Sequence, residues 1–330
     1  MLRALYVLNS EAYRNIYGPT EQAEIADLVE LIGAPQTAQS IHDQPELLAQ
    51  AEIILSGWGM PKLDADFLAA APNLKAVFYG AGSIKNIVSD DFWARNIPIT
   101  SSYAANAVPV AEFTISQILF CLKKGWQHAL AIRERGQMVK RLTVPGAYGR
   151  TVGVVSLGMI GQLVCRHLLA FELEVIAYDP YVDTAIADDL GVSLCPLDEL
   201  FRRGDVVTLH TPWLPETEGL ITGAHFAQMK PDATFINTAR GAIVREAEMI
   251  DVLRQRSDLF ALLDVTYPEP PAAGSPLYTL PNVVLTPHLA GSRDQECQRM
   301  GRVVVDELRR FVHGEPLEWA ISREHAAIMA

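Results

Sequence analysis

Three side chains in the last third of the chain are suited to acid–base chemistry on a small anion. Arg240 lies in FINTARG, Glu269 in LLDVTYPEPP and His288 in VVLTPHLAG. Imidazole exchanges protons near neutral pH, and a neighbouring carboxylate favours its charged form. A guanidinium offers a planar fork that fits a carboxylate and an adjacent oxygen together. All three follow the ends of predicted strands, the rim at which open α/β sheets bind ligands.

Each of these residues also has a purely structural explanation. Arg240 could pair with Asp264 or Glu269 in an ion pair. His288 could be a loop histidine bonded to backbone, and Glu269, beside two prolines, could be solvated. Their joint occurrence after one sheet favours the catalytic interpretation.

A second candidate site is the segment VGVVSLGMIG, Val152 to Gly161, which reads as a strand, a tight turn and the start of a helix. Gly158 would let backbone approach a pyrophosphate, and Gly161 would let helix and strand pack closely. Asp179 follows at the end of the next predicted strand, where a carboxylate receives ribose hydroxyls. That carboxylate would repel a 2′-phosphate, which favours NAD over NADP.

Ser156 departs from this pattern, because it stands where the first glycine usually lies. We expect its φ angle to stay negative, which would give an altered but working loop. The alternative is an ordinary turn between a strand and a helix.

The elements that must position these residues form two alternating series of strands and helices. In the first hundred residues, strands are predicted at 5–8, 53–55, 76–79 and 97–100, with a helix at 63–71. Apolar residues at Ile25, Leu28, Val29 and Ile32 predict another helix, which Thr20 would cap and Gly33 would end.

The second series begins after an apolar helix predicted at 108–123. Its six strands are predicted at 152–155, 174–177, 205–209, 233–237, 259–263 and 283–285. Such apolar runs with little polar alternation predict a parallel sheet covered on both faces. A last helix at 302–313 should end at Gly314.

Composition narrows the function further. A length of 330 residues suggests two domains, and 27 basic against 39 acidic residues give a net charge of −12. That charge disfavours a nucleic-acid or anionic-membrane partner. It would also repel an anionic substrate, so binding of such a substrate needs specific cationic side chains. Segment 108–122 carries Glu112 and falls short of a membrane span. Four scattered cysteines without metal-ligand spacing suit a reducing cytosol, and we expect a soluble, cytoplasmic protein without a metal.

The motifs of Val152 to Gly291 resemble, in order and spacing, those of the D-isomer-specific 2-hydroxyacid dehydrogenase family, which includes phosphoglycerate, glycerate, lactate and formate dehydrogenases. The matching segments are VGVVSLGMIG, AYDP, LDELFRRGDVVTLHTPWLPET, MKPDATFINTARGAIV, LLDVTYPEPP and LPNVVLTPHLAG. The first hundred residues resemble the family more loosely, through NAVPVAE at 106–112 and YGAGS at 79–83. Ile84 stands where the family usually has an aspartate.

The resemblance implies an α/β protein in which a Rossmann doubly wound parallel sheet is inserted into a smaller flavodoxin-like βα domain. The NAD-binding domain would span 104–294, and the substrate-binding domain would combine 1–103 with 295–330. It further implies NAD as cofactor, a small 2-oxo or D-2-hydroxy acid as substrate, and a homodimer formed through the NAD-binding domain.

The resemblance also implies individual roles. Arg240 would hold the substrate carboxylate and 2-oxo group together with backbone N–H groups of Ala81 and Gly82, and His288 would be the acid/base with Glu269 as partner. Formate dehydrogenases of the family have glutamine as that partner, so Glu269 favours hydroxyacid chemistry. Asp264 would hydrogen-bond the nicotinamide amide or ribose. The full set of implied cofactor-binding residues is Ser156, Gly158, Met159, Ile160, Gly161, Asp179, His210, Thr211, Thr238, Ala239, Arg240, Asp264, His288 and Gly291.

Two questions stay open at this level. The family also contains transcriptional corepressors that sense NAD(H), and Ile84 in place of the aspartate keeps such an interaction protein as the alternative function. The substrate side chain is unassigned: no basic cluster in the N-terminal glycine loops points to a phosphate, and Trp58 could line the pocket or pack in the core.

Overall fold

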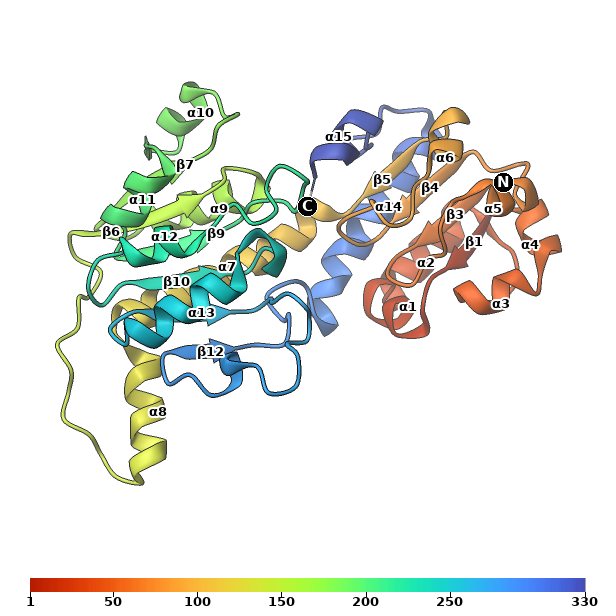
Figure 1. Cartoon of the computed structure of the whole chain (residues 1–330). Coiled ribbons are helices and arrows are strands. Elements are labelled where there is room, and N and C mark those ends of the chain that lie inside the picture. Colours follow the sequence, from red (N-terminus) through yellow and green to blue (C-terminus); the bar gives the residue numbers. More distant parts are fainter. Residues whose placement is uncertain (330) are drawn as a thin grey trace. The chain divides into compact units, whose positions relative to one another are not determined.

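The computed structural model describes residues 1–329, which divide into two compact units (Figure 1). Met1–Asn106 and Ser292–Met329 form the first unit, and Ala107–Gly291 form the second. Each unit is built on one sheet with every strand pair parallel. The predicted α/β class with two parallel sheets is confirmed.

The first unit has a five-stranded sheet in the order β2-β1-β3-β4-β5. Its strands are β1 (Arg3–Val7), β2 (Glu30–Leu31), β3 (Ile53–Ser56), β4 (Ala76–Tyr79) and β5 (Ile99–Ser101). This is the flavodoxin-like order, with the switch point between β1 and β3. The helices of this unit are α1 (Ser10–Ile16), α2 (Pro19–Leu28), α3 (Ala38–His42), α4 (Pro45–Gln50), α5 (Ala65–Ala70), α6 (Asp90–Ala94), α14 (Cys297–His313) and α15 (Arg323–Ile328).

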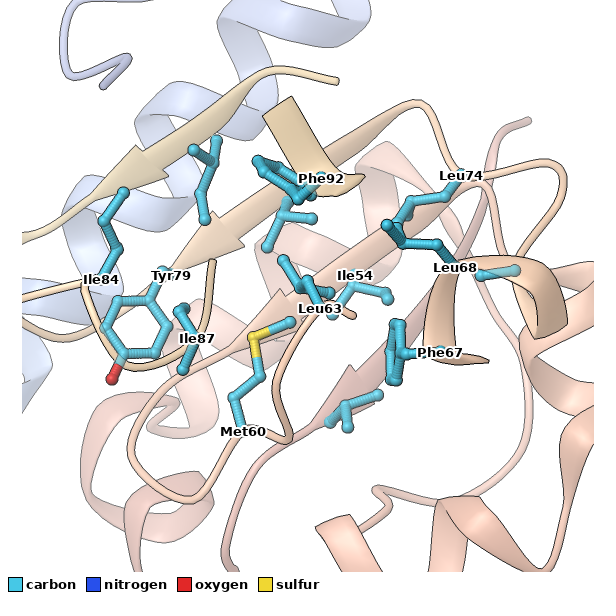
Figure 2. Packing of buried hydrophobic residues seen from close by; sticks show 14 of the residues in the cluster. Ile54, Met60, Leu63, Phe67, Leu68, Leu74, Tyr79, Ile84, Ile87 and Phe92 are labelled. Carbon is cyan, nitrogen blue, oxygen red and sulfur yellow. The ribbon is translucent and has the colours of Figure 1, made fainter. Parts of the chain in front are cut away.

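Apolar side chains cover both faces of this sheet. On one face, Ile54 and Tyr79 pack with Phe67 and Phe92 from α5 and α6 (Figure 2). On the other face, α1, α2 and α14 pack against alternate residues of the same strands. Helix α14 ends at Gly314, a left-handed cap, as predicted. Because α14 comes from the far end of the chain, this unit needs both chain ends to complete its core.

Helix α2 differs from the sequence prediction at both ends. It starts at Pro19 with Gly18 as its N-cap, not at Thr20, and it ends at Leu28. The predicted extension to Ile32 is wrong because the chain turns into β2. There the Ile32 N–H donates to the Ala4 carbonyl at 2.9 Å.

The second unit has a seven-stranded sheet in the order β12-β11-β10-β9-β6-β7-β8. Its strands are β6 (Arg150–Val155), β7 (Leu173–Tyr178), β8 (Ser193–Leu194), β9 (Val206–Leu209), β10 (Thr234–Asn237), β11 (Phe260–Leu263) and β12 (Val283–Leu285). The six predicted strands are present, and β8 is an addition, too short to show as an apolar run. Strand order reverses between β6 and β9, the switch point at which Rossmann sheets bind ligands.

Helices cover both faces of this second sheet as well. The helices of this unit are α7 (Tyr103–Leu122), whose first residues belong to the first unit, α8 (Gly125–Arg135), α9 (Met159–Leu168), α10 (Thr184–Asp189), α11 (Leu197–Arg203), α12 (Gly223–Ala227) and α13 (Glu246–Gln255). Short 3-10 turns lie at Gly241–Ile243 and Pro276–Tyr278 in this unit and at Asp294–Glu296 in the first unit. Helix α8 has no buried residue and projects away from the sheet (Figure 1).

Helix α7 begins five residues earlier than predicted and reaches 20 residues. The expectation that this segment is too short to span a membrane is therefore wrong on length. By length and apolar composition, α7 could cross a membrane. However, half of its most apolar 18-residue stretch is buried inside the protein, and core helices of soluble proteins can be equally long and apolar.

Candidate active site

The predicted catalytic residues all leave the same edge of the second sheet. Arg240 follows β10, Glu269 follows β11 and His288 follows β12. These three strands are adjacent and parallel, so their carboxyl ends meet at one edge.

His288 and Glu269 form a direct contact. The distance from His288 Nδ1 to Glu269 Oε1 is 2.6 Å, and both side chains are partly exposed. A carboxylate on Nδ1 fixes the ring orientation, so Nε2 is the nitrogen placed for proton exchange with a ligand. The sequence expectation that Glu269 partners His288 matches this geometry.

Asp264 holds the loop that carries His288. Its buried carboxylate accepts hydrogen bonds from Leu289 N and Ala290 N, each at 2.9 Å, and from Thr286 Oγ1 at 2.6 Å. The His288 N–H donates to the Asp264 carbonyl at 2.9 Å. His288 needs this support because its φ is +51°, in the left-handed region that non-glycine residues rarely adopt. One Asp264 oxygen accepts two of these bonds and the other accepts one, so capacity for a further donor remains and the expected contact with nicotinamide stays a prediction.

Arg240 is largely buried, yet its guanidinium pairs with no carboxylate of residues 1–329. Its Nη1 donates to the Ala239 carbonyl at 2.7 Å. Burial lowers the pKa of Arg240 while the Glu269 charge opposes that shift, and guanidinium remains protonated in proteins. The alternative of an ion pair with Asp264 or Glu269 is therefore not what the structure shows. A buried, unpaired cation is costly and suits an anionic ligand.

The glycine loop joins β6 to α9. Gly158 is the N-cap of α9, and a Cβ built there would meet no protein atom within 4 Å. A Cβ on Gly161 would lie 2.0 Å from the Ser156 carbonyl oxygen. Gly161 is therefore required for packing, as predicted, whereas Gly158 leaves open space before a helix N-terminus, where a phosphate is favoured.

The expected negative φ of Ser156 is wrong: its φ is +76°. The physical reason is that the packing of α9 and the pairing of β7 fix the backbone on both sides of this residue. The Ser156 N–H donates to the Tyr178 carbonyl at 2.8 Å, and the Ser156 carbonyl packs against Gly161.

Asp179 ties the end of β7 to this loop. One carboxylate oxygen accepts from Leu157 N at 2.8 Å, and the other accepts from Tyr181 N at 2.8 Å and Val182 N at 3.1 Å. Each carboxylate oxygen has two lone pairs, so capacity for a further donor such as a ribose hydroxyl remains.

Two polar side chains after β9, on the other side of the switch point, lack partners. His210 is buried, and its ring pairs with Thr208 Oγ1 at 3.0 Å, but His210 Nδ1 and Thr211 Oγ1 are buried without a hydrogen-bond partner among residues 1–329. Burial lowers the pKa of His210 to about 3, so the ring is neutral. Such orphaned polar atoms are rare in proteins and fit a polar ligand at the switch point.

The remaining predicted cofactor residues lie on the same unit. Thr238 and Ala239 are buried just after β10, and Thr238 Oγ1 lies 3.2 Å from Thr114 Oγ1 of α7. Met159 is exposed in the first turn of α9, where Ile160 is half-buried, and Gly291 is half-buried at the end of the unit. Together with the orphaned atoms and the open glycine loop, these residues fit a dinucleotide. No cluster of metal-ligating side chains occurs in residues 1–329.

The predicted substrate-binding loop belongs to the first unit and follows β4. The Ala81 and Gly82 carbonyls accept from Ser101 Oγ at 3.0 and 2.5 Å, whereas the N–H groups of Ala81 and Gly82 bond to no acceptor in the described residues. Free N–H groups in succession suit an anion. Ile84 is fully buried in the apolar cluster beside Tyr79 (Figure 2). Trp58 packs partly buried against both clusters of this unit.

Sequence reasoning missed an aromatic pair on the second unit. Trp213, after β9, packs edge-on against Tyr267 with ring centroids 5.5 Å apart. This contact joins the loop of Thr211 to the loop of Glu269. The two residues are far apart in the sequence and follow no periodic pattern, so only the fold reveals the pair.

Comparisons with known proteins agree with this arrangement. The family model described as the NAD binding domain of D-isomer specific 2-hydroxyacid dehydrogenases matches residues 115–290, more than half of the chain. The curated D-3-phosphoglycerate dehydrogenase from Mycobacterium tuberculosis is 35% identical over 90% of this chain and 56% of its own length. The one from Archaeoglobus fulgidus is 33% identical over 79% of this chain and 50% of its own length. The chain thus spans about half the length of these relatives.

Solved structures resemble nearly the whole chain. The TT0316 protein from Thermus thermophilus is 26% identical with a TM-score of 0.77, covering 97% of this chain and 100% of that one. The D-isomer specific 2-hydroxyacid dehydrogenase from Lactobacillus delbrueckii ssp. bulgaricus, solved with NAD, is 22% identical with a TM-score of 0.82 over 98% and 100% of the two chains. The second likeness supports the fold alone.

Proposed function

Because the chain belongs to the D-isomer specific 2-hydroxyacid dehydrogenase family, whose matched domain binds NAD, we propose that it is an NAD-dependent oxidoreductase of a small 2-oxo or D-2-hydroxy acid. The observation that carries this proposal is the His288–Glu269 contact on the sheet edge that also holds Arg240 without a carboxylate partner.

Arg240 binds the substrate. Its guanidinium fork receives the carboxylate and the neighbouring 2-oxo oxygen, the two groups that define a 2-oxo acid. Because Arg240 is largely buried, its charge is little screened by water, and the developing negative charge on the oxygen is stabilised more than it would be in solution. The free N–H groups of Ala81 and Gly82 are also proposed to bind a carboxylate.

His288 moves the proton. During reduction, negative charge grows on the 2-oxo oxygen, and the imidazolium delivers a proton to it from Nε2. During oxidation, the same nitrogen removes the hydroxyl proton. Glu269 orients the ring through Nδ1, and Asp264 fixes the loop that aims the ring.

NAD(H), when bound, accepts or supplies the hydride. The residues that would hold it surround the switch point: Gly158 and the first turn of α9 at the pyrophosphate, Asp179 at the adenosine ribose, and His210 and Thr211 across the crevice. Thr238 and Ala239 would border it, and Asp179 disfavours the 2′-phosphate of NADP.

The wider organisation is proposed on the same basis. Residues 104–294 would be the NAD-binding domain, and residues 1–103 with 295–330 the substrate-binding domain. Helix α8 packs on its own unit through the half-buried Trp126 but has no fully buried residue, and this exposed helix supports a homodimer formed through the NAD-binding domain. A cytoplasmic location accords with the free thiols of Cys121, Cys165, Cys195 and Cys297.

A panel of 2-oxo acids, including pyruvate, glyoxylate, hydroxypyruvate and 3-phosphohydroxypyruvate, tests the proposal when NADH absorbance is followed. The wild type should oxidise NADH with at least one acid, and His288→Ala should lose turnover while retaining NADH binding. Wild-type protein that binds NADH but is silent across the panel would contradict the proposed activity and favour an NAD(H)-sensing protein. A fully active His288→Ala protein would contradict the proposed role of His288 as the acid/base.

A further inference from the structure

The nucleotide loop contains one residue in a costly conformation that its own side chain does nothing to stabilise. Ser156 has a φ of +76°, a region that glycine enters freely and that L residues with a Cβ rarely adopt. Its position is the one that a glycine usually occupies in this type of loop.

The surrounding structure leaves Ser156 no other backbone conformation. Its N–H is held by the Tyr178 carbonyl at 2.8 Å, and its carbonyl oxygen packs where a Cβ on Gly161 would otherwise lie. The next residue, Leu157, is held through its N–H by Asp179 at 2.8 Å. The strain is therefore imposed from both sides and persists whatever the side chain at position 156.

The Ser156 side chain gains nothing from the protein in return. Its hydroxyl makes no hydrogen bond to any of residues 1–329, and the residue is only half-buried. Serine side chains in strained turns commonly bond to nearby backbone, so an unbonded hydroxyl here is unusual. A glycine would satisfy every backbone contact without the strain.

The unused hydroxyl lies in the part of the unit that best fits a phosphate. Gly158, two residues on, leaves open space at the N-terminus of α9, a helix of ten residues. Across the switch point, the buried Thr211 Oγ1 and His210 Nδ1 also lack partners among residues 1–329. A hydroxyl donor matches the acceptor oxygens of a pyrophosphate, which carry charge but no proton.

We propose that the Ser156 hydroxyl donates a hydrogen bond to the pyrophosphate of the bound dinucleotide. Compared with glycine, this serine lowers the stability of the fold and raises the affinity for the cofactor. The inference rests on the proposed placement of NAD(H) over the glycine loop. It adds a donor that a loop with glycine at this position does not have.

Two substitutions separate strain from binding. Ser156→Ala removes the hydroxyl and keeps the strain, whereas Ser156→Gly removes both. Titration of NADH by its fluorescence should show about tenfold weaker binding for both variants. The melting temperature without ligand should rise by about 2–4 °C for Ser156→Gly alone.

A matched control relieves strain elsewhere. Asn96 has a φ of +54° in the first unit, so Asn96→Gly should leave NADH affinity unchanged and alter the melting temperature by no more than Ser156→Gly does. Binding of ADP-ribose, which contains the pyrophosphate, and of adenosine, which has no phosphate, locates the contact. The loss should appear with ADP-ribose and be absent with adenosine.

Wild-type affinity for NADH in both Ser156 variants would overturn the inference and leave the proposed function intact. An equal loss with adenosine and ADP-ribose would also overturn it, because the contact would then not be to a phosphate. Absence of NADH binding by the wild type would instead contradict the proposed function itself.

Discussion

Replacing Asp264 with asparagine tests how the proposed acid/base is positioned. The Asp264 carboxylate accepts three hydrogen bonds, from Thr286 Oγ1 at 2.6 Å and from Leu289 N and Ala290 N at 2.9 Å. These bonds fix the loop on either side of His288, whose backbone is in the left-handed region. Asparagine has nearly the same shape but only one acceptor oxygen, so its amide group must face a donor.

The free-energy cost of Asp264→Asn can be estimated from the number of hydrogen bonds that the substitution breaks. A hydrogen bond to a charged acceptor contributes about 1.5–3 kcal/mol, and a buried donor left without a partner costs about 1–3 kcal/mol. Asp264→Asn loses at least one such bond and leaves at least one N–H unsatisfied, a change of about 3 kcal/mol. Because the loop can shift without unfolding the sheet, we expect the fraction of protein with His288 correctly aimed to fall about 100-fold.

Steady-state reduction at saturating NADH measures this effect. Turnover of Asp264→Asn should fall about 100-fold with NADH affinity within threefold of wild type. Thr286→Val, which removes one hydroxyl donor and keeps both amide bonds, should lose about tenfold. Wild-type turnover in Asp264→Asn would refute the positioning argument. A tenfold or larger loss of NADH affinity would indicate instead that Asp264 contacts the nicotinamide directly.

Three further outcomes are expected. Gly161→Ala should lower both the melting temperature and the NADH affinity, because its Cβ would lie 2.0 Å from a carbonyl oxygen. Gly158→Ala should fold normally and lose only NADH affinity, because its Cβ would enter open space. Thermal melts and fluorescence titration measure the two effects. His210 has a pKa of about 3 when folded against about 6.5 unfolded, so the unfolded state binds the extra proton between these values. Lowering the pH from 7 to 5 should therefore reduce the free energy of unfolding by about 2 kcal/mol more in wild type than in His210→Gln, measured by urea unfolding. Trp213→Ala, which removes the ring packed on Tyr267, should reduce turnover about fivefold, and unchanged turnover would show that this pair does not support the Glu269 loop.

The sequence predicted those features that depend on local pattern. Apolar runs located the long strands of both sheets, and the glycine spacing located the turn from β6 into α9. Because parallel strands end at one edge, the residues after β10, β11 and β12 could be grouped from the order of apolar runs and polar loops alone.

Features that depend on distant partners were beyond sequence reasoning. The early end of α2 follows from pairing of Ile32 with Ala4, and the positive φ of Ser156 follows from Tyr178 and Gly161 acting together. The role of Asp264 as a loop anchor is equally invisible, because its partners lie more than twenty residues away.

The most direct test of the central claim follows the hydride itself. In a single turnover with NADH deuterated at C4 on both faces and a 2-oxo acid identified in the panel, the wild type should yield the D-2-hydroxy acid with one deuterium at C2, and His288→Ala should yield none above the uncatalysed rate. Unlabelled product, the L isomer, or equal label from His288→Ala would contradict the account.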